Sequence, residues 1–134
     1  MMPDGMQSRL IKAQKIYSEG EKVMHWRIRE LEQKGCDMQG AMRRFLDDED
    51  FYLKCLHETM EAKRLATIRE ALGRQDYRRA FEVAHDLKGV AGTLGLTPVY
   101  DAVCRVVEDL RYDPKPELEQ DLRSLQETCE RLFD

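Results

Sequence analysis

The sequence predicts an all-α protein, built as an antiparallel four-helix bundle with an additional N-terminal helical segment. Prolines are rare, with 4 in 134 residues, and two of them fall in the single break Asp113-Pro114-Lys115-Pro116. No stretch alternates apolar and polar residues beside a hairpin turn, as a half-buried strand would. Apolar residues instead recur every three or four positions, which places them along one side of a helix.

Length and composition predict one domain with a modest core and a strongly solvated surface. Of the 134 residues, 42% are hydrophobic and 36% are charged. The net charge of −4 argues against a general attraction to nucleic acid or to an anionic membrane. No stretch approaches the roughly 20 apolar residues of a membrane span, and the N-terminus lacks the apolar segment of a secretory signal. We therefore expect a cytoplasmic protein that inserts into no membrane and binds no nucleic acid.

The four cysteines are far apart in the sequence and form no C-x-x-C pair, so neither a zinc ribbon nor a thioredoxin-type motif is predicted. Reduced thiols buried on helices are the simplest expectation. The four residues are Cys36, Cys55, Cys104 and Cys129.

Residues 1–34 are expected to form a helical extension ahead of a bundle domain at residues 35–134. From about Met6 to Lys34 the apolar spacing is coiled-coil-like but imperfect, and Gly20 interrupts it. The extension is a linker helix, a dimerisation helix or an extra helix on the bundle. The last is favoured, because an isolated helix of marginal amphipathicity gains most of its stability from tertiary packing.

A short helix is predicted at the start of the bundle domain, followed by a long one. Gly35 breaks the chain, and Asp37 is a suitable N-cap for a helix through Phe45. After a second break at Asp47-Asp48, one of these aspartates can cap a helix over about residues 49–72. The apolar members of this long helix are Leu53, Leu56, Met60, Leu65, Ile68 and Leu72.

Three more helices complete the expected bundle. Asp76 can cap the first, which runs through about Leu94. Thr97 is expected to cap the second, with Pro98 at the first helical position, where a missing N–H costs nothing. Asp113-Pro114 repeats this device before the last helix. The apolar stripe of the last helix is Leu118, Leu122, Leu125, Cys129 and Leu132.

The helix of residues 76–94 has two contrasting faces. At ~100° per residue, His85 lies about 160° from Leu87, the centre of the apolar stripe. We therefore expect His85 to project from the side opposite the core, whereas a lone histidine is more commonly satisfied inside it. The stripe consists of Ala80, Val83, Ala84, Leu87, Val90, Ala91 and Leu94.

Two glycines share the outer face with His85. Gly92 falls beside it and Gly89 just across, with Lys88 at one flank. Each mid-helix glycine costs roughly 1 kcal/mol relative to alanine. Their presence makes sense if another protein must approach the helix backbone closely; close packing against a neighbouring helix is the alternative.

The residue types on this face suit phosphoryl transfer. Neutral imidazole is a nucleophile near pH 7, since its unperturbed pKa is about 6.5, and Lys88 can screen phosphoryl charge. The glycines follow a helical sequence and not a strand, so no P-loop is predicted. We expect the chain to hold no cofactor or metal of its own and to depend on Mg²⁺ supplied by a partner.

The segment His85–Gly95, His-Asp-Leu-Lys-Gly-Val-Ala-Gly-Thr-Leu-Gly, resembles the signature of histidine-containing phosphotransfer (HPt) domains, His-x-Leu-Lys-Gly-x-Ala or Ser. Upstream, Gly35-Cys36-Asp37 and Arg44–Tyr52 resemble the opening of that family, where a short helix ending in Arg-Phe leads through an acidic turn into the first long helix. The resemblance covers about Leu31 to Asp134.

The resemblance implies a phosphorelay intermediate of two-component signal transduction, without catalytic activity of its own. Such a protein takes a phosphoryl group from the aspartate of one response-regulator receiver domain and passes it to another, in pathways that include a hybrid sensor kinase. Matched residue by residue, His85 would be the phosphoacceptor, Lys88 the charge neighbour and Gly89 the opening for the receiver.

The helical wheel adds docking candidates to those of the family pattern. Gly92, like Gly89, is expected to leave the helix backbone accessible to a partner. Arg78 is nearly aligned with His85 two turns earlier, and it suits the acidic pocket of a receiver. The simplest interpretation of the basic pairs Arg43-Arg44 and Arg78-Arg79 is a solvated face. Phe81, an apolar residue on the outer face, is either a docking contact or packed under the N-terminal segment.

Three alternative functions remain. The first is an adaptor that keeps the HPt fold but carries no phosphate. The second is the dimerisation domain of a histidine kinase, whose phosphorylated helix shares His-Asp-Leu-Lys but continues to a proline, where this chain has Gly89-Val90. The third is an HD-type metal phosphohydrolase built on His85-Asp86, with His57 and either Asp101 or Asp109 as further ligands.

Overall fold

The computed structural model describes residues 25–133, and over this range the chain is helical without strands. The all-α prediction is therefore confirmed, while most of the predicted N-terminal helix lies outside the described residues. The helices are α2 (Trp26–Gln33), α3 (Met38–Arg44), α4 (Glu49–Glu61), α5 (Arg64–Gly73), α6 (Tyr77–Thr93), α7 (Thr97–Leu110) and α8 (Leu118–Phe133).

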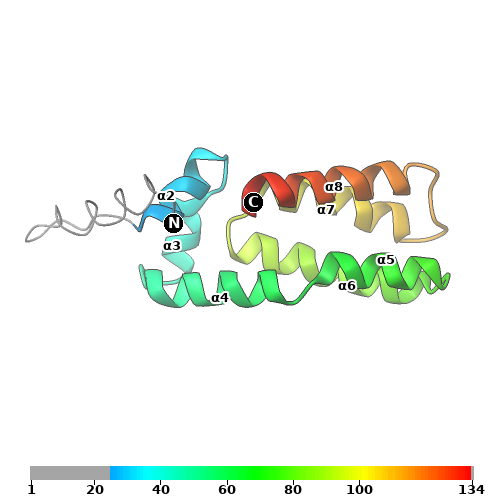
Figure 1. Cartoon of the computed structure of the whole chain (residues 1–134), viewed down its shortest axis with the longest axis horizontal. Helices are drawn as coiled ribbons and strands as arrows, with labels where there is room; N and C mark the ends of the chain where they lie inside the picture. The colour runs from blue at the N-terminus through cyan, green and yellow to red at the C-terminus, as the bar shows by residue number, and fades with distance from the viewer. Residues whose placement is uncertain (1–24, 134) are drawn as a thin grey trace, which may run out of the picture.

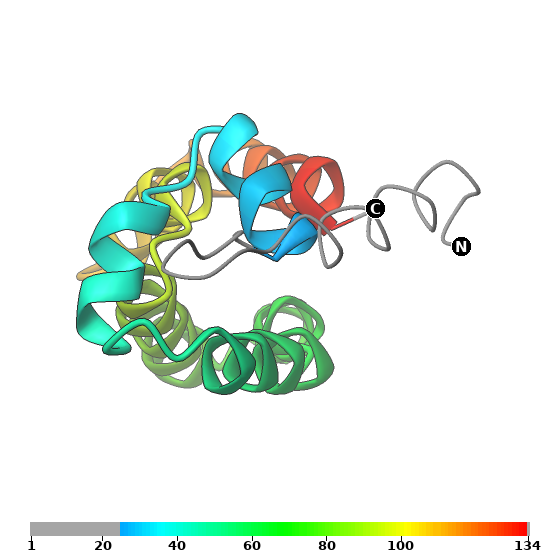
Figure 2. The same cartoon turned by 90° about the vertical axis from the view of Figure 1, so that its left-hand side faces the viewer.

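The bundle is formed by α5, α6, α7 and α8, which run antiparallel in chain order (Figure 1). Helix α6 packs against both α5 and α7, and α7 packs against α8. Helix α4 extends the line of α5, and α2 and α3 lie at the same end as α4 (Figures 1 and 2). The predicted four-helix bundle is confirmed.

The core draws on every described helix. Ile28 and Leu31 of α2 are fully buried with the bundle residues, although they belong to the predicted extension. The boundary at residue 34 stays a prediction. The buried Tyr52 hydroxyl donates a hydrogen bond to the Leu94 carbonyl oxygen at 2.6 Å, which ties α4 to the end of α6. Burial raises the pKa of Tyr52, so the hydroxyl keeps its proton.

The predicted single helix over residues 49–72 is wrong, because the chain breaks into α4 and α5 at Lys63. Leu56 and Ile68 both face the core, yet twelve residues of unbroken helix would turn them about 120° apart. Lys63 adopts the left-handed conformation, with φ 53° and ψ 42°, and this resets the phase. Such a conformation costs roughly 1–2 kcal/mol, which is comparable to or less than the gain from burying one large aliphatic side chain.

Three predicted N-caps are confirmed. The side chains of Asp37, Asp48 and Asp76 each accept a hydrogen bond from the backbone N–H three residues later, at 2.9, 3.0 and 3.1 Å. These bonds satisfy donors that have no partner inside the helix.

The predicted N-cap of α7 is wrong by one residue. Leu96 occupies the cap position, so that Thr97 begins the helix and Pro98 lies in its first turn. The backbone N–H of Leu96 bonds to the Ala91 carbonyl at 2.9 Å, and the residue that closes α6 therefore also opens α7. The predicted seam of α7 is buried as expected: Val99, Val103, Val106 and Leu110.

The predicted cap at Asp113-Pro114 is also wrong, since α8 begins at Leu118. A proline disfavours helical geometry in the residue before it. Because Pro116 follows two residues after Pro114, the helix cannot start until both are passed. The expected stripe of α8 is present: Leu122, Leu125 and Leu132 are buried, and Leu118 and Cys129 are partly buried against the core.

The four cysteines are free, as predicted, but Cys36 lies between α2 and α3 and not on a helix. Cys36 is buried and the other three are half-buried. Burial raises the pKa of both Cys36 and Cys129 to about 11. Within residues 25–133, no helix is long and apolar enough to cross a membrane.

Candidate functional site

Helix α6 separates an apolar face from an exposed one. Asp76 caps its first turn, and six of the seven residues of the predicted stripe are buried. The seventh, Val90, is half-buried. His85 lies near the middle of the helix and is exposed, as its position opposite the stripe predicts. The imidazole is therefore carried on a rigid element and is open to a partner.

The imidazole of His85 lies against an aromatic ring. The ring centroids of Phe81 and His85 are 5.9 Å apart, at an interplanar angle of 31°. The Arg111 guanidinium carbon lies over the same ring, 5.8 Å from the Phe81 centroid. Phe81 is half-buried and packs against the edge of the core.

Lys88 and Gly92 meet a second aromatic residue, Tyr100 of α7. The Lys88 ammonium lies 6.0 Å from the Tyr100 ring centroid. A Cβ at Gly92 would contact the same ring at 3.4 Å, so this glycine has a neighbour on its own bundle. A Cβ at Gly89 would have no atom within 4 Å. Close packing against a neighbouring helix is therefore supported as the reason for Gly92, but not for Gly89.

His85 and Gly89 form a ridge between two hollows. One hollow, of about 340 Å³, reaches from this ridge to Arg44 and Tyr100. The other, of about 580 Å³, reaches to α4 and is lined partly by Phe45, Cys55 and Val90. A partner that approaches His85 therefore meets a bare helix backbone with concave surfaces on both sides.

The Hpt domain family model matches residues 52–134, which is more than half of the chain. The chain belongs to the Hpt domain family. Searches of the curated proteins and of the solved structures found no match. Hpt domains are phosphotransfer carriers, not catalysts, and they interact with receiver domains and kinases in phosphorelays.

Arg44 lines the smaller hollow beside His85 and is exposed, as a solvated face predicts, but its side chain is also fixed by hydrogen bonds. Its Nε donates to the Thr93 carbonyl and its Nη2 to the Gly92 carbonyl, both at 3.0 Å. These bonds satisfy carbonyls at the end of α6 and place a positive charge at the negative end of the helix dipole. The Arg44-Phe45 pair, which resembles the opening of the family, was the sequence feature that could have pointed to Arg44.

Gly95 holds α3 beside the end of α6, and so places Arg44 there. Its carbonyl accepts a hydrogen bond from the Asp37 backbone N–H at 2.8 Å. Gly95 has a φ of +71°, and a Cβ at this position would clash with the Asp37 carbonyl oxygen. Only glycine allows this close approach.

Asp86, next to His85, is held by Arg64 from the start of α5. Arg64 Nε and Asp86 Oδ2 are 2.6 Å apart. Sequence reasoning missed this pair, because it depends on the break at Lys63. In the metal-hydrolase alternative Asp86 would bind a metal, and within residues 25–133 no three His, Cys, Asp or Glu side chains form a group that could hold one.

Charged groups surround the site at the ends of α6 and α7. Arg78 is almost fully exposed, with its Nε 3.3 Å from a carboxylate oxygen of Glu82. Arg111 bonds to Glu108 at 2.7 Å and lowers the pKa of that carboxyl, and the charge of Lys88 adds to this effect. The positive charge around His85 is therefore partly matched by acidic side chains.

Proposed function

We propose that this Hpt domain relays a phosphoryl group between receiver-domain aspartates through a phosphohistidine at His85. The exposure of His85 beside the bare backbone of Gly89 is the observation that carries the proposal. An unprotonated ring nitrogen attacks the phosphorus of a receiver's aspartyl phosphate. A P–N bond forms, the P–O bond to the aspartate breaks, and the carboxylate leaves with the electron pair. The return step reverses these changes.

Two neighbours assist the step in this proposal. Lys88, one turn after His85, offsets the negative charge of the phosphoryl group. Gly89 lets the rim of the receiver's active site come close to α6. Gly92, Phe81 and Arg78 are proposed docking contacts.

In this proposal the partner supplies the divalent cation. Phosphoryl transfer needs a divalent cation to neutralise developing charge, and we assign Mg²⁺ to the receiver domain. The proposed partners are response-regulator receiver domains and a hybrid sensor kinase, which places the relay in the cytoplasm.

The proposal is tested by incubating the pure protein with radiolabelled phosphorylated receiver domains and Mg²⁺. We expect label on the chain that survives base and is lost in acid, and that is absent in His85→Gln. His57→Gln is the matched control, because His57 is also exposed but lies on α4. Label that persists in a folded His85→Gln protein would sink the assignment, and no label from any receiver would favour the adaptor alternative.

A further inference from the structure

An apolar groove opens between the α4–α5 break and the end of α8. Its volume is about 280 Å³, which leaves room for several water molecules. Water in such a groove finds few polar partners, so a side chain that replaces it is favoured. The groove lies across Arg64 from the larger of the two hollows beside His85. Its apolar lining includes Met60, Leu65, Leu87, Leu96, Val99 and Phe133.

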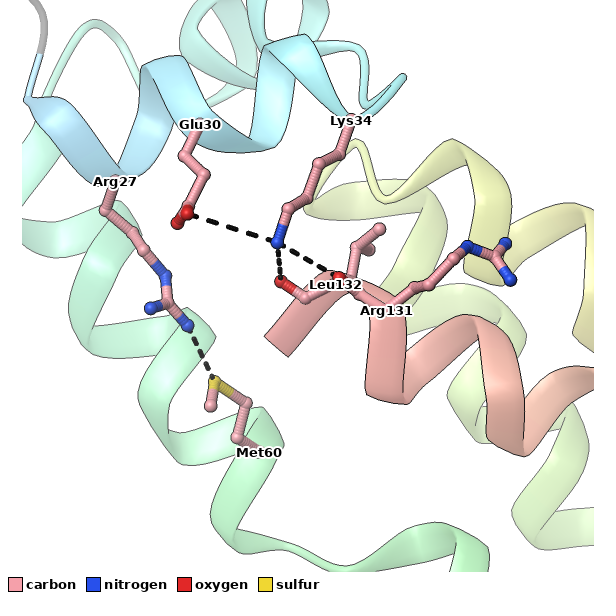
Figure 3. A network of polar contacts seen from close by, with 6 residues as sticks. All are labelled: Arg27, Glu30, Lys34, Met60, Arg131 and Leu132. Carbon is pink, nitrogen blue, oxygen red and sulfur yellow. Dashed lines mark hydrogen bonds and ion pairs between the residues drawn. The ribbon is translucent and has the colours of Figure 1, made fainter. Parts of the chain in front are cut away.

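Helix α2 lies between α4 and the end of α8 and contacts both (Figure 3). On one side, Arg27 Nη2 lies 3.8 Å from the Met60 sulfur on α4. On the other, Lys34 Nζ donates to the carbonyls of Arg131 and Leu132 at the end of α8, at 3.0 and 3.3 Å. The two walls of the groove are thus joined by the helix that directly follows residues 1–24.

Residues 1–24 join the described fold on the α4 side of the groove. The backbone N–H of His25 donates to Glu49 Oε1 at 3.0 Å, in the first turn of α4. From Glu49 to Met60 the helix rises about 17 Å, whereas 24 residues span about 36 Å even when fully helical. The preceding segment is long enough to reach the groove and lie along it.

The sequence of this segment carries an apolar stripe. Met6, Leu10, Ala13 and Tyr17 fall within about 60° on a helical wheel. Ser8 lies on the opposite side. A helix over residues 6–17 would therefore offer one apolar face that could cover the groove.

A polar group at the groove is also incomplete. Arg64 Nη1 is buried and has no hydrogen-bond partner among the residues that the structure describes. A buried donor without an acceptor is unfavourable, and buried polar groups are normally paired. Arg64 also lines the groove, although Nη1 itself is shielded from solvent.

We propose that residues 6–17 of this chain dock as an amphipathic helix in the groove between α4–α5 and α8, with the stripe of Met6, Leu10, Ala13 and Tyr17 against Leu65 and Phe133. This inference is independent of the proposed phosphotransfer.

Cys129 provides a native probe, because it lines the groove and is half-buried. Each cysteine of the full chain is labelled with a maleimide near pH 8, and its rate is followed by peptide mass spectrometry. In the stripe variant Leu10→Asp/Tyr17→Asp, we expect Cys129 to react at least fivefold faster than in the native chain. The control Ser8→Asp/Ser18→Asp adds the same charge off the stripe and should leave the rate unchanged. Cys104, which does not line the groove, should react equally in all three proteins.

Two results would overturn the proposal. One is an equal Cys129 rate in the three proteins. The other is protection of Cys129 that weakens on dilution, which would assign the groove to a second copy of the chain.

A cross-linking measurement decides the matter if the stripe variant fails to fold, which labelling of the buried Cys36 would reveal. Under mild oxidation, Leu10→Cys should form an intramolecular disulfide with Cys129, while Ser8→Cys should not. Equal cross-linking of the two variants, or none in either, contradicts the docked helix.

Discussion

Gly89 leaves a bare stretch of backbone one turn after His85, and no atom lies within 4 Å of the place a Cβ would take. We expect Gly89→Leu to slow phosphoryl transfer from a receiver at least tenfold, because the side chain would project into the approaching partner. The folded protein should lose nothing, since leucine in place of a helical glycine gains up to about 1 kcal/mol. Transfer kinetics and thermal unfolding measure the two effects.

Gly73→Leu is the matched control for this substitution. Gly73 also has open space around it, but it lies at the end of α5. Transfer as fast in Gly89→Leu as in Gly73→Leu would mean that the receiver does not approach α6 at this point.

The residues around His85 differ in how far sequence alone could place them. Lys88 and Gly89 share a helix with His85, so the helical period fixes their relative positions. Arg44, Arg64 and Tyr100 come from other helices, and their approach depends on the turn at Gly95 and the break at Lys63. Such contacts arise from tertiary packing, which no local pattern encodes.

Among the helices, local chemistry predicted the aspartate caps of α3, α4 and α6 but not the break at Lys63. An aspartate cap acts within three residues of its own position, and Asp37, Asp48 and Asp76 form as expected. No glycine or proline near Lys63 indicates a helix break in the sequence. The break lets the side chains of Leu56 and Ile68 both face the core. In one continuous helix these two side chains would point in different directions.

This account predicts opposite effects for the same substitution at two lysines. Lys63→Gly should stabilise the fold by about 0.5–1 kcal/mol, because glycine adopts the left-handed conformation without the cost that a side chain imposes. Lys54→Gly, at an exposed position inside α4, should destabilise it by about 1 kcal/mol. Chemical denaturation of both variants checks this, and a loss of stability in Lys63→Gly would contradict the strained break.

For the whole molecule, the packed core reaches beyond the residues that match the Hpt domain family. The match begins at residue 52, yet Ile28, Leu31 and Met38 are buried in the same core. Arg44 also precedes the match, and it binds the end of the helix that carries His85. Removal of α2 and α3 would therefore expose core residues and free the last carbonyls of α6.

The packing of α7 against α8 gives the whole fold a pH dependence. Asp109 is 6% exposed, and its Oδ2 has no hydrogen-bond partner among the described residues. Burial, followed by a hydrogen bond with Asp121 and the charge of that carboxyl, raises the pKa of Asp109 to about 7. Glu117 acts in the same direction, and Lys115 opposes it.

In the unfolded chain the Asp109 carboxyl titrates near its ordinary pKa of about 4. Between pH 4 and 7 the folded protein therefore binds more protons than the unfolded one. The stability contributed by this group is complete below about pH 4 and is lost as the pH rises through 7.

Asp109→Asn cannot ionise, so it should be more stable than the native chain at pH 8, by at least about 1 kcal/mol, or roughly 4–8 °C in Tm. Thermal unfolding at pH 5 and pH 8 tests this against Asp101→Asn, an exposed position on the same helix that should behave as the native chain does. If Asp109→Asn and Asp101→Asn show the same change in Tm between the two pH values, Asp109 ionises in the folded protein as it does in the unfolded chain, and the pH dependence arises elsewhere.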